Sequence, residues 1–158
     1  MQKLQNCRDQ LLLMLETDRM LLMAMNRDQL SLCLTDFDRL AKDLEIQLAP
    51  EIFSDDSRQA IGIKTTRMLL VDSSLHAWYT YFLLVRKSDL RAMGVSGFKG
   101  APSPYGSVEL GYAIHENYRN QGYMTEAVQS LVRWAFSHED CQRVTAETLR
   151  DNLASQRV

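Results

Sequence analysis

The chain has 158 residues, of which 46% are hydrophobic and 24% charged, a balance typical of one soluble globular domain. A formal net charge of −2 excludes a broad positive field that would attract nucleic acid or an anionic membrane surface. We therefore expect a single domain over residues 1–158 with neither of these partners, in which any bound anion is held locally.

The first part of the chain contains a predicted helix, an extended segment and a second helix. The first helix covers residues 3–14, and the extended segment covers Arg19–Met25. Asn26 is a suitable N-cap for the second helix, because its short side chain can accept a hydrogen bond from a free backbone N–H. Apolar residues then recur near helical spacing at Leu30, Leu34 and Phe37.

Two further helical stretches follow. The helical pattern continues over Asp38–Leu48, and we expect Pro50 to end it because proline cannot continue the hydrogen-bond ladder. Residues 57–71 form another predicted helix, which Gly62 weakens.

Strands and turns dominate the next part. Tyr79–Val85 is aromatic and β-branched, and with Arg91–Phe98 it predicts a hairpin around a polar turn at Lys87–Leu90. The loop Gly100–Gly106 is dense in turn residues and leads to a third strand over Ser107–Ile114.

The third strand has two different faces, because alternate side chains point to opposite sides of a strand. One face is apolar and consists of Val108, Leu110, Tyr112 and Ile114. The other face carries Glu109 among Ser107, Gly111 and Ala113, neighbours so small that another group can approach the carboxylate closely.

A strand–helix–strand unit completes the chain. Met124–His138 is a predicted helix with an apolar stripe, Arg143–Leu149 is a predicted strand, and Asn152 would cap a last helix. Such a unit implies a right-handed crossover between parallel strands. The order of elements therefore predicts a mixed α/β fold.

The turn at Arg119–Met124 is the strongest functional signal. The first N–H groups of a helix have no intrahelical partner and lie at the positive end of its dipole, so they suit a phosphate. Gly122 lets the backbone approach a ligand closely, and Arg119 adds a cation. A P-loop or dinucleotide motif, which a nucleotide-binding domain would need, is absent. From the residues alone, phosphate binding and a plain connecting turn both stay open.

The cysteines and the first apolar stretch indicate the compartment. Cys7, Cys33 and Cys141 are widely spaced, so neither a zinc site nor a disulfide framework can be drawn and no metal is expected. Residues 11–15 are apolar, but charges follow at once and no cleavage site appears, which argues against a signal peptide. We expect a cytoplasmic protein with reduced thiols.

The run GFKGAP…VELGYAIHENYRNQGYMTEAVQSLVRWAF, then VTAETLRDNLASQRV, resembles the GNAT superfamily of N-acetyltransferases, and most closely its ribosomal-protein N-terminal acetylase branch. The family motif Arg/Gln-x-x-Gly-x-Gly/Ala here reads Arg119-x-x-Gly122-x-Met124, so its sixth position departs from the rule. The likeness covers residues 79–158 and the early segment Glu16–Leu22, and it is loose over 26–78.

The resemblance implies a mostly antiparallel sheet, flanked by helices, in which one parallel strand pair splays apart to hold acetyl-CoA as co-substrate. The implied cofactor-binding residues are Tyr112, Ala113 and Ile114 for the pantetheine arm, and Arg119, Asn120, Gln121, Gly122, Tyr123, Met124 and Thr125 for the pyrophosphate. Asn152 would also contact the arm, and Ser155 would lie near the reacting thiol as a further catalytic candidate.

The implied function is transfer of an acetyl group to a primary amine, either a protein N-terminus or a small-molecule amine, by direct attack in a ternary complex. A free alkylamine titrates near ~10, so a base must take a proton at neutral pH. The resemblance offers Glu109 and Glu147 as that base, and a paired structural carboxylate is the alternative for each. The competing function is a non-catalytic GNAT-like module that binds acyl-CoA or a protein partner.

Similar proteins continue with further strands after the helix that Asn152 would cap. The resemblance therefore implies that C-terminal strands of the fold are missing from this chain. Because an exposed sheet edge can pair with another chain, we expect a possible homodimer.

Overall fold

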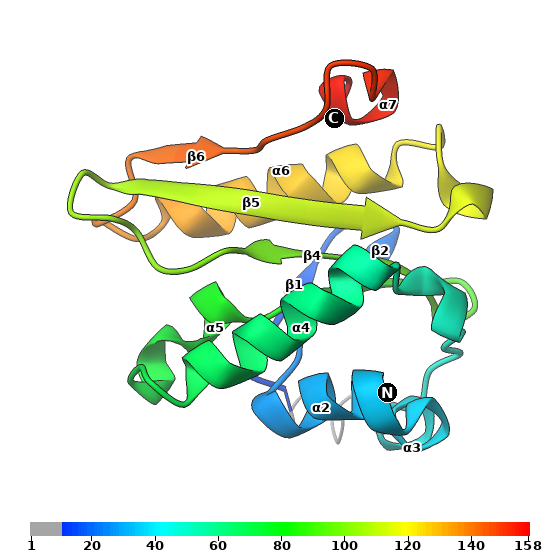
Figure 1. Ribbon diagram of the computed structural model, residues 1–158. Helices are drawn as coiled ribbons and strands as arrows, with labels where there is room; N and C mark the ends of the chain where they lie inside the picture. The colour runs from blue at the N-terminus through cyan, green and yellow to red at the C-terminus, as the bar shows by residue number, and fades with distance from the viewer. Residues whose placement is uncertain (1–10) are drawn as a thin grey trace.

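The computed structural model describes residues 11–158, which form one six-stranded sheet with helices on both faces (Figure 1). The strands follow chain order across the sheet, and each neighbouring pair is antiparallel except the last, β5 with β6, which is parallel. They are β1 Leu13–Glu16, β2 Met20–Ala24, β3 Phe82–Arg86, β4 Arg91–Phe98, β5 Ser107–Ile114 and β6 Arg143–Thr145. The expected mixed α/β class with one parallel pair is confirmed.

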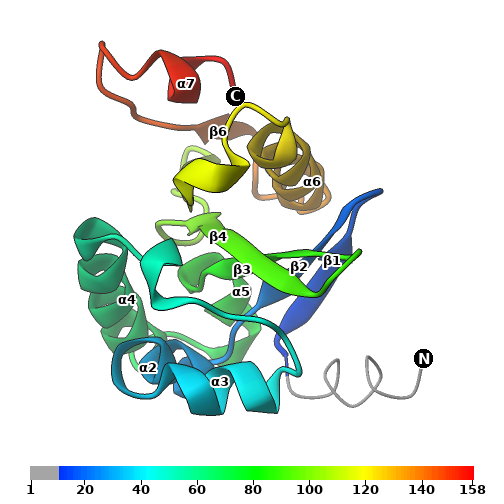
Figure 2. The same ribbon diagram turned by 90° about the vertical axis from the view of Figure 1, so that its right-hand side faces the viewer.

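The helices divide between the two faces of the sheet. Figure 2 shows α2, α3 and α4 on one side and α6 on the other. The helices are α2 Arg27–Thr35, α3 Phe37–Asp43, α4 Asp55–Met68, α5 His76–Tyr79, α6 Tyr123–Phe136 and α7 Leu153–Gln156. Three short 3-10 turns join them, η1 Pro50–Ile52, η2 Ser73–Leu75 and η3 Glu116–Tyr118.

Each face of the sheet buries its own apolar core. Alternate residues of β3 show the division, because Leu83 and Val85 pack with α2–α4, whereas Phe82 and Leu84 pack with α6. All four are fully buried. A strand covered on both faces has no need for polar residues at alternate positions, which explains the continuous apolar run of β3.

Several predicted elements are confirmed. β4 and β5 begin and end at the predicted residues, and the turn over 87–90 joins β3 to β4. Asn26 caps α2 reciprocally: its Oδ1 accepts from Gln29 N at 2.9 Å, and Gln29 Oε1 accepts from Asn26 N at 2.8 Å. This capping box holds α2 close to the end of β2.

The predicted helix over 3–14 is wrong where the structure describes it, and residues 3–10 lie outside the described part. Leu13–Glu16 is strand β1, whose Leu13 lies opposite Ala24 in an antiparallel pair with β2. A short apolar run suits either a helix or a strand, and here pairing with a distant segment decides.

The predicted helix over Asp38–Leu48 is also wrong in its limits. α3 ends at Asp43 and Glu45 adopts a φ of 53°, so the chain turns five residues before Pro50, which itself starts η1. The segment then bridges Gln47 to Arg91, and Gln47 O accepts from Ala92 N at 2.8 Å. Competition from this bridge, rather than proline, ends the helix.

One helix and one strand have boundaries that differ from the predicted ones for local reasons. The helix predicted over 57–71 is α4, which starts at Asp55 because Ser54 caps it, and which ends at Met68. The strand predicted from Tyr79 begins only at Phe82, since Tyr79 is the last residue of α5.

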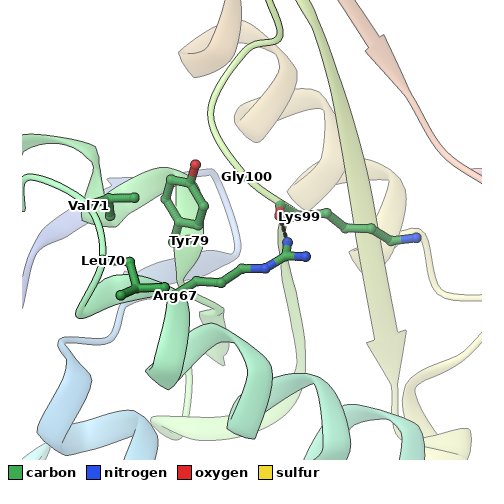
Figure 3. Close-up of a pocket in the computed structure, with 6 residues that line it drawn as sticks. All are labelled: Arg67, Leu70, Val71, Tyr79, Lys99 and Gly100. Carbon is green, nitrogen blue, oxygen red and sulfur yellow. Dashed lines mark hydrogen bonds between the residues drawn. The ribbon is translucent and has the colours of Figure 1, made fainter.

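Two cations of α4 fasten this helix to the end of β4. Lys64 Nζ donates to Phe98 O. Arg67 Nη1 donates to Lys99 O at 2.8 Å (Figure 3). Residues three apart share one face of a helix, so both side chains reach successive carbonyls of one strand end.

The remaining predictions concern the thiols, metals and membranes. Cys33 and Cys141 are buried free thiols, and burial raises the pKa of Cys33 to about 12, whereas Cys7 lies outside the described residues. Over residues 11–158, no three His, Cys, Asp or Glu side chains gather as they would around a metal ion. In the same range no helix combines the length and apolar character that crossing a membrane requires.

Candidate functional site

The junction of β5 and α6 contains a helix start without a side-chain cap. Gly122 is the N-cap of α6, and among residues 11–158 no side chain caps its first turn. By contrast, Asn26, Asp36 and Ser54 each cap the helix that follows them. The N–H groups of the first turn of α6 are therefore left for an external acceptor, at the positive end of a 14-residue helix.

The backbone of the turn is left-handed at two positions. Asn120 has a φ of 58° and Gly122 a φ of 78°, so the chain reverses around Gln121 before α6 begins. A Cβ at position 122 would also lie 3.3 Å from Arg19 Nη2. Glycine relieves both the conformational strain and this contact.

The side chains of the turn separate into exposed and buried sets. Arg119 and Gln121 are exposed, and Arg119 Nε donates to Ile114 O at 3.4 Å, which keeps the guanidinium beside the end of β5. Tyr123 and Met124 are buried at 9% and 5% exposure in the core beneath α6. The methionine that departs from the family motif therefore points inward, and its side chain does not cover the exposed turn.

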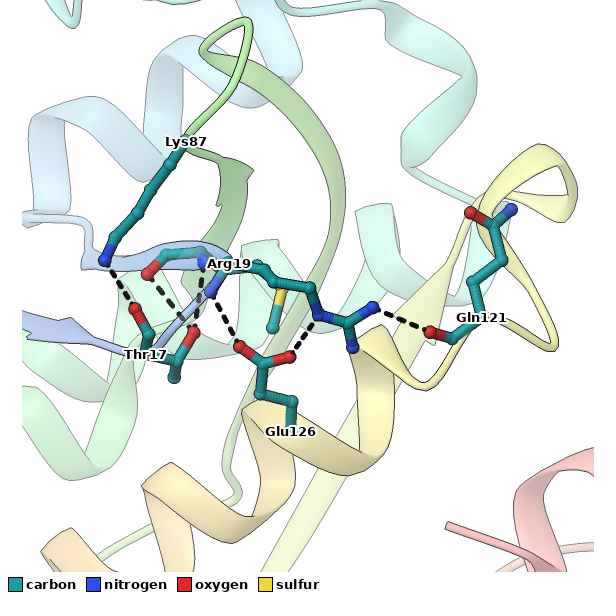
Figure 4. A network of polar contacts seen from close by, with 6 residues as sticks. Thr17, Arg19, Lys87, Gln121 and Glu126 are labelled. Atoms are coloured by element: carbon teal, nitrogen blue, oxygen red, sulfur yellow. Dashed lines mark hydrogen bonds and ion pairs between the residues drawn. The ribbon is translucent and has the colours of Figure 1, made fainter.

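The side chain of Arg19 contacts both the turn and the first turn of α6 (Figure 4). It follows β1, and its Nη1 donates to Gln121 O at 2.9 Å while its Nε donates to Glu126 Oε2 at 2.6 Å. The backbone N of Arg19 donates to Glu126 Oε1 at 3.0 Å. Burial opposes ionisation of Glu126, but hydrogen bonds from Thr17 and Arg19 outweigh it and lower the pKa of that carboxyl.

Arg19 is a site residue that was not predicted from the sequence. The segment that contains it was predicted only as an extended piece, and its partners lie 102 and 107 residues further along the chain. An arginine directly before an apolar strand was the available signal, but it does not identify a partner so far away.

The parallel pair β5–β6 is short. Ser107 to Glu109 pair with Arg143 to Thr145, and β6 ends there, whereas β5 continues to Ile114. On its other side β5 remains paired with β4 as far as Ile114. Within the described chain, one edge of β5 is therefore unpaired from Leu110 onward, where Tyr112, Ala113 and Ile114 lie. The strand predicted over Arg143–Leu149 is correct only for its first three residues.

The segment after β6 returns to the open part of β5. Tyr112 Oη donates to Ser155 O at 3.0 Å, and Asn152 Oδ1 accepts from Ser155 N at 3.1 Å as the N-cap of α7. Tyr112, Asn152 and Ser155, which were all predicted as site residues, are thus brought together, and the predicted capping role of Asn152 is confirmed.

The two candidate bases have different surroundings. Glu109 is half-buried on β5, where its carboxylate pairs with Lys99 Nζ and its main-chain oxygen accepts from Lys99 N at 2.8 Å. Glu147 lies beyond the end of β6 and is exposed, so its predicted place on a strand is wrong. The two carboxylates therefore do not occupy equivalent positions on the parallel pair.

Fold and site together define an α/β domain that offers an unpaired strand edge and, at its end, an uncapped helix start. Residues 32–158 match the family model described as the acetyltransferase (GNAT) domain. The chain is 31% identical over 147 residues to the uncharacterized N-acetyltransferase YjdG of Bacillus subtilis, covering 93% of this chain and 86% of that protein. The chain therefore belongs to the GNAT family and is an acetyltransferase.

Solved structures agree with this fold. The ribosomal-protein-S5-alanine acetyltransferase from Vibrio fischeri is 18% identical with a TM-score of 0.60, covering 92% of this chain and 79% of that one. The RimL ribosomal L7/L12 alpha-N-protein acetyltransferase, solved in complex with coenzyme A, is 17% identical with a TM-score of 0.60, covering 92% and 80%. The fold predicted from the family resemblance is confirmed.

The Arg19 contacts predict an effect on coenzyme A. We expect Arg19→Ala to weaken coenzyme A binding about tenfold, because hydrogen bonds from a charged group contribute about 1.5–3 kcal/mol when their partners are left unpaired. Calorimetric titration of the variant would measure the change. Arg27→Ala is the matched control, since both arginine side chains are 45% exposed and Arg27 makes only a 3.7 Å pair with Asp28. A lower melting temperature with unchanged affinity would reduce Arg19 to a structural residue.

Proposed function

We propose that the protein transfers an acetyl group from acetyl-CoA to a primary amine, by direct attack in a ternary complex. The acceptor would be a protein N-terminus or a small-molecule amine. The observation that carries the proposal is the uncapped, glycine-started helix α6 at the end of the unpaired edge of β5. A diphosphate and an extended amide-containing arm need those two features side by side.

The residues of the turn suit the pyrophosphate of acetyl-CoA. Backbone N–H groups from Gln121 to Thr125 would donate to it, and the exposed Arg119 and Asn120 would border it. The edge of β5 at Tyr112–Ile114 would pair with the pantetheine arm, and Asn152 and Ser155 would close over it. When bound, acetyl-CoA supplies the thioester that is the acetyl donor.

The protein's own groups would manage the protons. The amine nitrogen attacks the thioester carbon, the carbon–sulfur bond breaks, and the sulfur leaves as a thiolate that takes up a proton. Glu109 is our preferred base, because it lies on the face of β5 whose small neighbours let an amine approach its carboxylate closely. Glu147 is the second candidate base, and Ser155, near the open strand edge, is the candidate for protonating the thiolate.

Binding and turnover can be tested separately. We expect coenzyme A to raise the melting temperature, whereas ATP without the pantetheine arm and NAD should do so much less. A thiol-release assay with acetyl-CoA over amines, peptides and aminoglycosides should then detect turnover. Stabilisation by coenzyme A without thiol release for any acceptor would favour the non-catalytic module. No stabilisation by coenzyme A would contradict both functions.

The location and assembly belong to the same proposal. We place the protein in the cytoplasm, where acetyl-CoA and reduced thiols are compatible with buried free cysteines. β6 is the last strand of the described sheet, so its outer edge could pair with a second copy in a homodimer. A single monomeric species in sedimentation would contradict the dimer.

A further inference from the structure

A hollow with two cations in its lining lies between the end of α4 and the end of β4. It has a volume of about 380 Å³, within the range of roughly 300–1,000 Å³ that small-molecule sites occupy. Figure 3 shows its lining residues, which are Arg67, Leu70, Val71, Tyr79, Lys99 and Gly100. The hollow is therefore apolar on one side and carries the Arg67 guanidinium on the other, because the Lys99 ammonium points away toward β5.

Lys99 pairs with Glu109, but the other two cations of this region, Lys64 and Arg67, contact main-chain oxygens instead. Lys64 and Arg67 donate to the carbonyls of Phe98 and Lys99, and over residues 11–158 neither has a carboxylate within ion-pair distance. Asp72 is close in sequence, but it accepts from Ser74 N and Ser74 Oγ at 2.9 and 2.6 Å. A carbonyl carries only a partial charge, so the charge of the Arg67 guanidinium is only partly compensated.

The crowding of positive charge affects Lys64. This lysine is only 7% exposed, and its Nζ lies 4.6 Å from the centre of the Tyr81 ring. Burial, and then the charges of Arg67 and Lys99, lower its pKa to about 7. A neutral donor would be enough to hold α4 against β4, and it would avoid the destabilisation that a buried cation without an anionic partner causes. The structural contact alone therefore does not explain why the donors are charged. A bound anion would turn this repulsion into attraction.

We propose that the hollow binds a carboxylate of the acceptor, so that the protein selects primary amines that carry a carboxylate. This inference rests on the proposed function, because it places the acceptor beside Glu109. Lys99 joins the two places: its main-chain oxygen accepts from Arg67, and its ammonium reaches back toward β5 to pair with Glu109 (Figure 3). Arg67 is the group that would hold the carboxylate, because within residues 11–158 its planar fork of donors uses only Nη1, for Lys99 O.

The apolar side of the hollow would contact the rest of the acceptor. Leu70 is 79% exposed and lines the hollow with the half-buried Val71 and Tyr79. Covering an exposed leucine removes apolar surface from water and stabilises a complex. The carboxylate would give the selectivity, and these residues would add affinity without selecting one side chain.

Paired ligands that differ in a single charge test the inference without depending on turnover. The first pair is the acetylated dipeptide amides N-acetyl-Ser-Asp and N-acetyl-Ser-Asn, and the second is N-acetylglycine and its amide. They would be titrated with and without coenzyme A. We expect the carboxylate member of at least one pair to bind about tenfold more tightly or better. The first pair reports a side-chain carboxylate, and the second reports the carboxylate of a free amino acid.

Variants of α4 connect the preference to the hollow. Arg67→Gln should remove the difference within the pair and leave coenzyme A binding unchanged, while Arg67→Lys should keep part of it. Arg58→Gln is the matched control, because Arg58 also lies on α4 and donates to a backbone carbonyl, Pro50 O at 3.4 Å, but does not line the hollow. Equal affinities within both pairs, or a preference that survives Arg67→Gln, would overturn the inference. If the parent protein did not bind coenzyme A, that result would instead count against the proposed function.

Discussion

Gly122→Val should weaken coenzyme A binding by about 10- to 100-fold, since a left-handed conformation costs a residue with a Cβ roughly 1–2 kcal/mol and β-branching adds to this cost. Gly122 has a φ of 78°, and a Cβ there would lie 3.3 Å from Arg19 Nη2. The turn would have to rotate its first N–H groups away from the phosphate to relieve this strain. Calorimetric titration with coenzyme A measures the loss directly.

The same substitution at a second glycine separates a local effect from a general one. Gly62 lies inside α4, and a Cβ there would meet nothing within 4 Å. Gly62→Val should therefore fold and bind coenzyme A like the parent protein, because valine is a better helix residue than glycine. An equal loss of affinity in both variants, or none in Gly122→Val, would show that the turn does not hold the phosphates.

The predictability of this fold depends on how local the signals are. β4 and β5 begin and end where predicted, because the polar turn over 87–90 and the loop over 100–106 mark their limits within a few positions. β1 was misread as helix, since only its pairing with β2 makes it a strand. The end of α3 was misplaced for a similar reason, because the bridge from Gln47 to Arg91 spans 44 residues. Local composition cannot report such pairings.

The residues of the candidate site also differ in whether a local sequence pattern identifies them. Gly122 and the start of α6 were predictable, because a strand pattern, a glycine and an amphipathic helix pattern follow one another directly in the sequence. Arg19, Lys64 and Arg67 act through contacts with residues 32 to 107 positions away, so they were not predicted. Tyr112 and Ser155 were predicted as site residues only through family resemblance, and the contact between them was not predicted.

Proton removal is the step for which the two predicted carboxylates can be separated. Glu109→Gln should lower kcat by about 10²- to 10⁴-fold, the usual contribution of a general base, and should leave the affinity for coenzyme A unchanged. Glutamine matches glutamate in shape, and the lost pair with the 56% exposed Lys99 should change stability by only about 0–1 kcal/mol. Steady-state rates with saturating acetyl-CoA would give the change in kcat.

The pH profile decides whether Glu109 acts on the proton or merely holds Lys99. Without a base, the amine must arrive already neutral, so the residual rate of Glu109→Gln should keep rising with pH toward the pKa of a free alkylamine near ~10. Glu147→Gln makes the same change on an exposed segment and should leave both rate and profile unaltered. If Glu147→Gln instead lost the rate while Glu109→Gln kept it, the proton would pass to the segment after β6. Of the two carboxylates, only Glu109 is joined through Lys99 to the hollow that Arg67 lines. A base at Glu147 would therefore also place the acceptor away from Arg67.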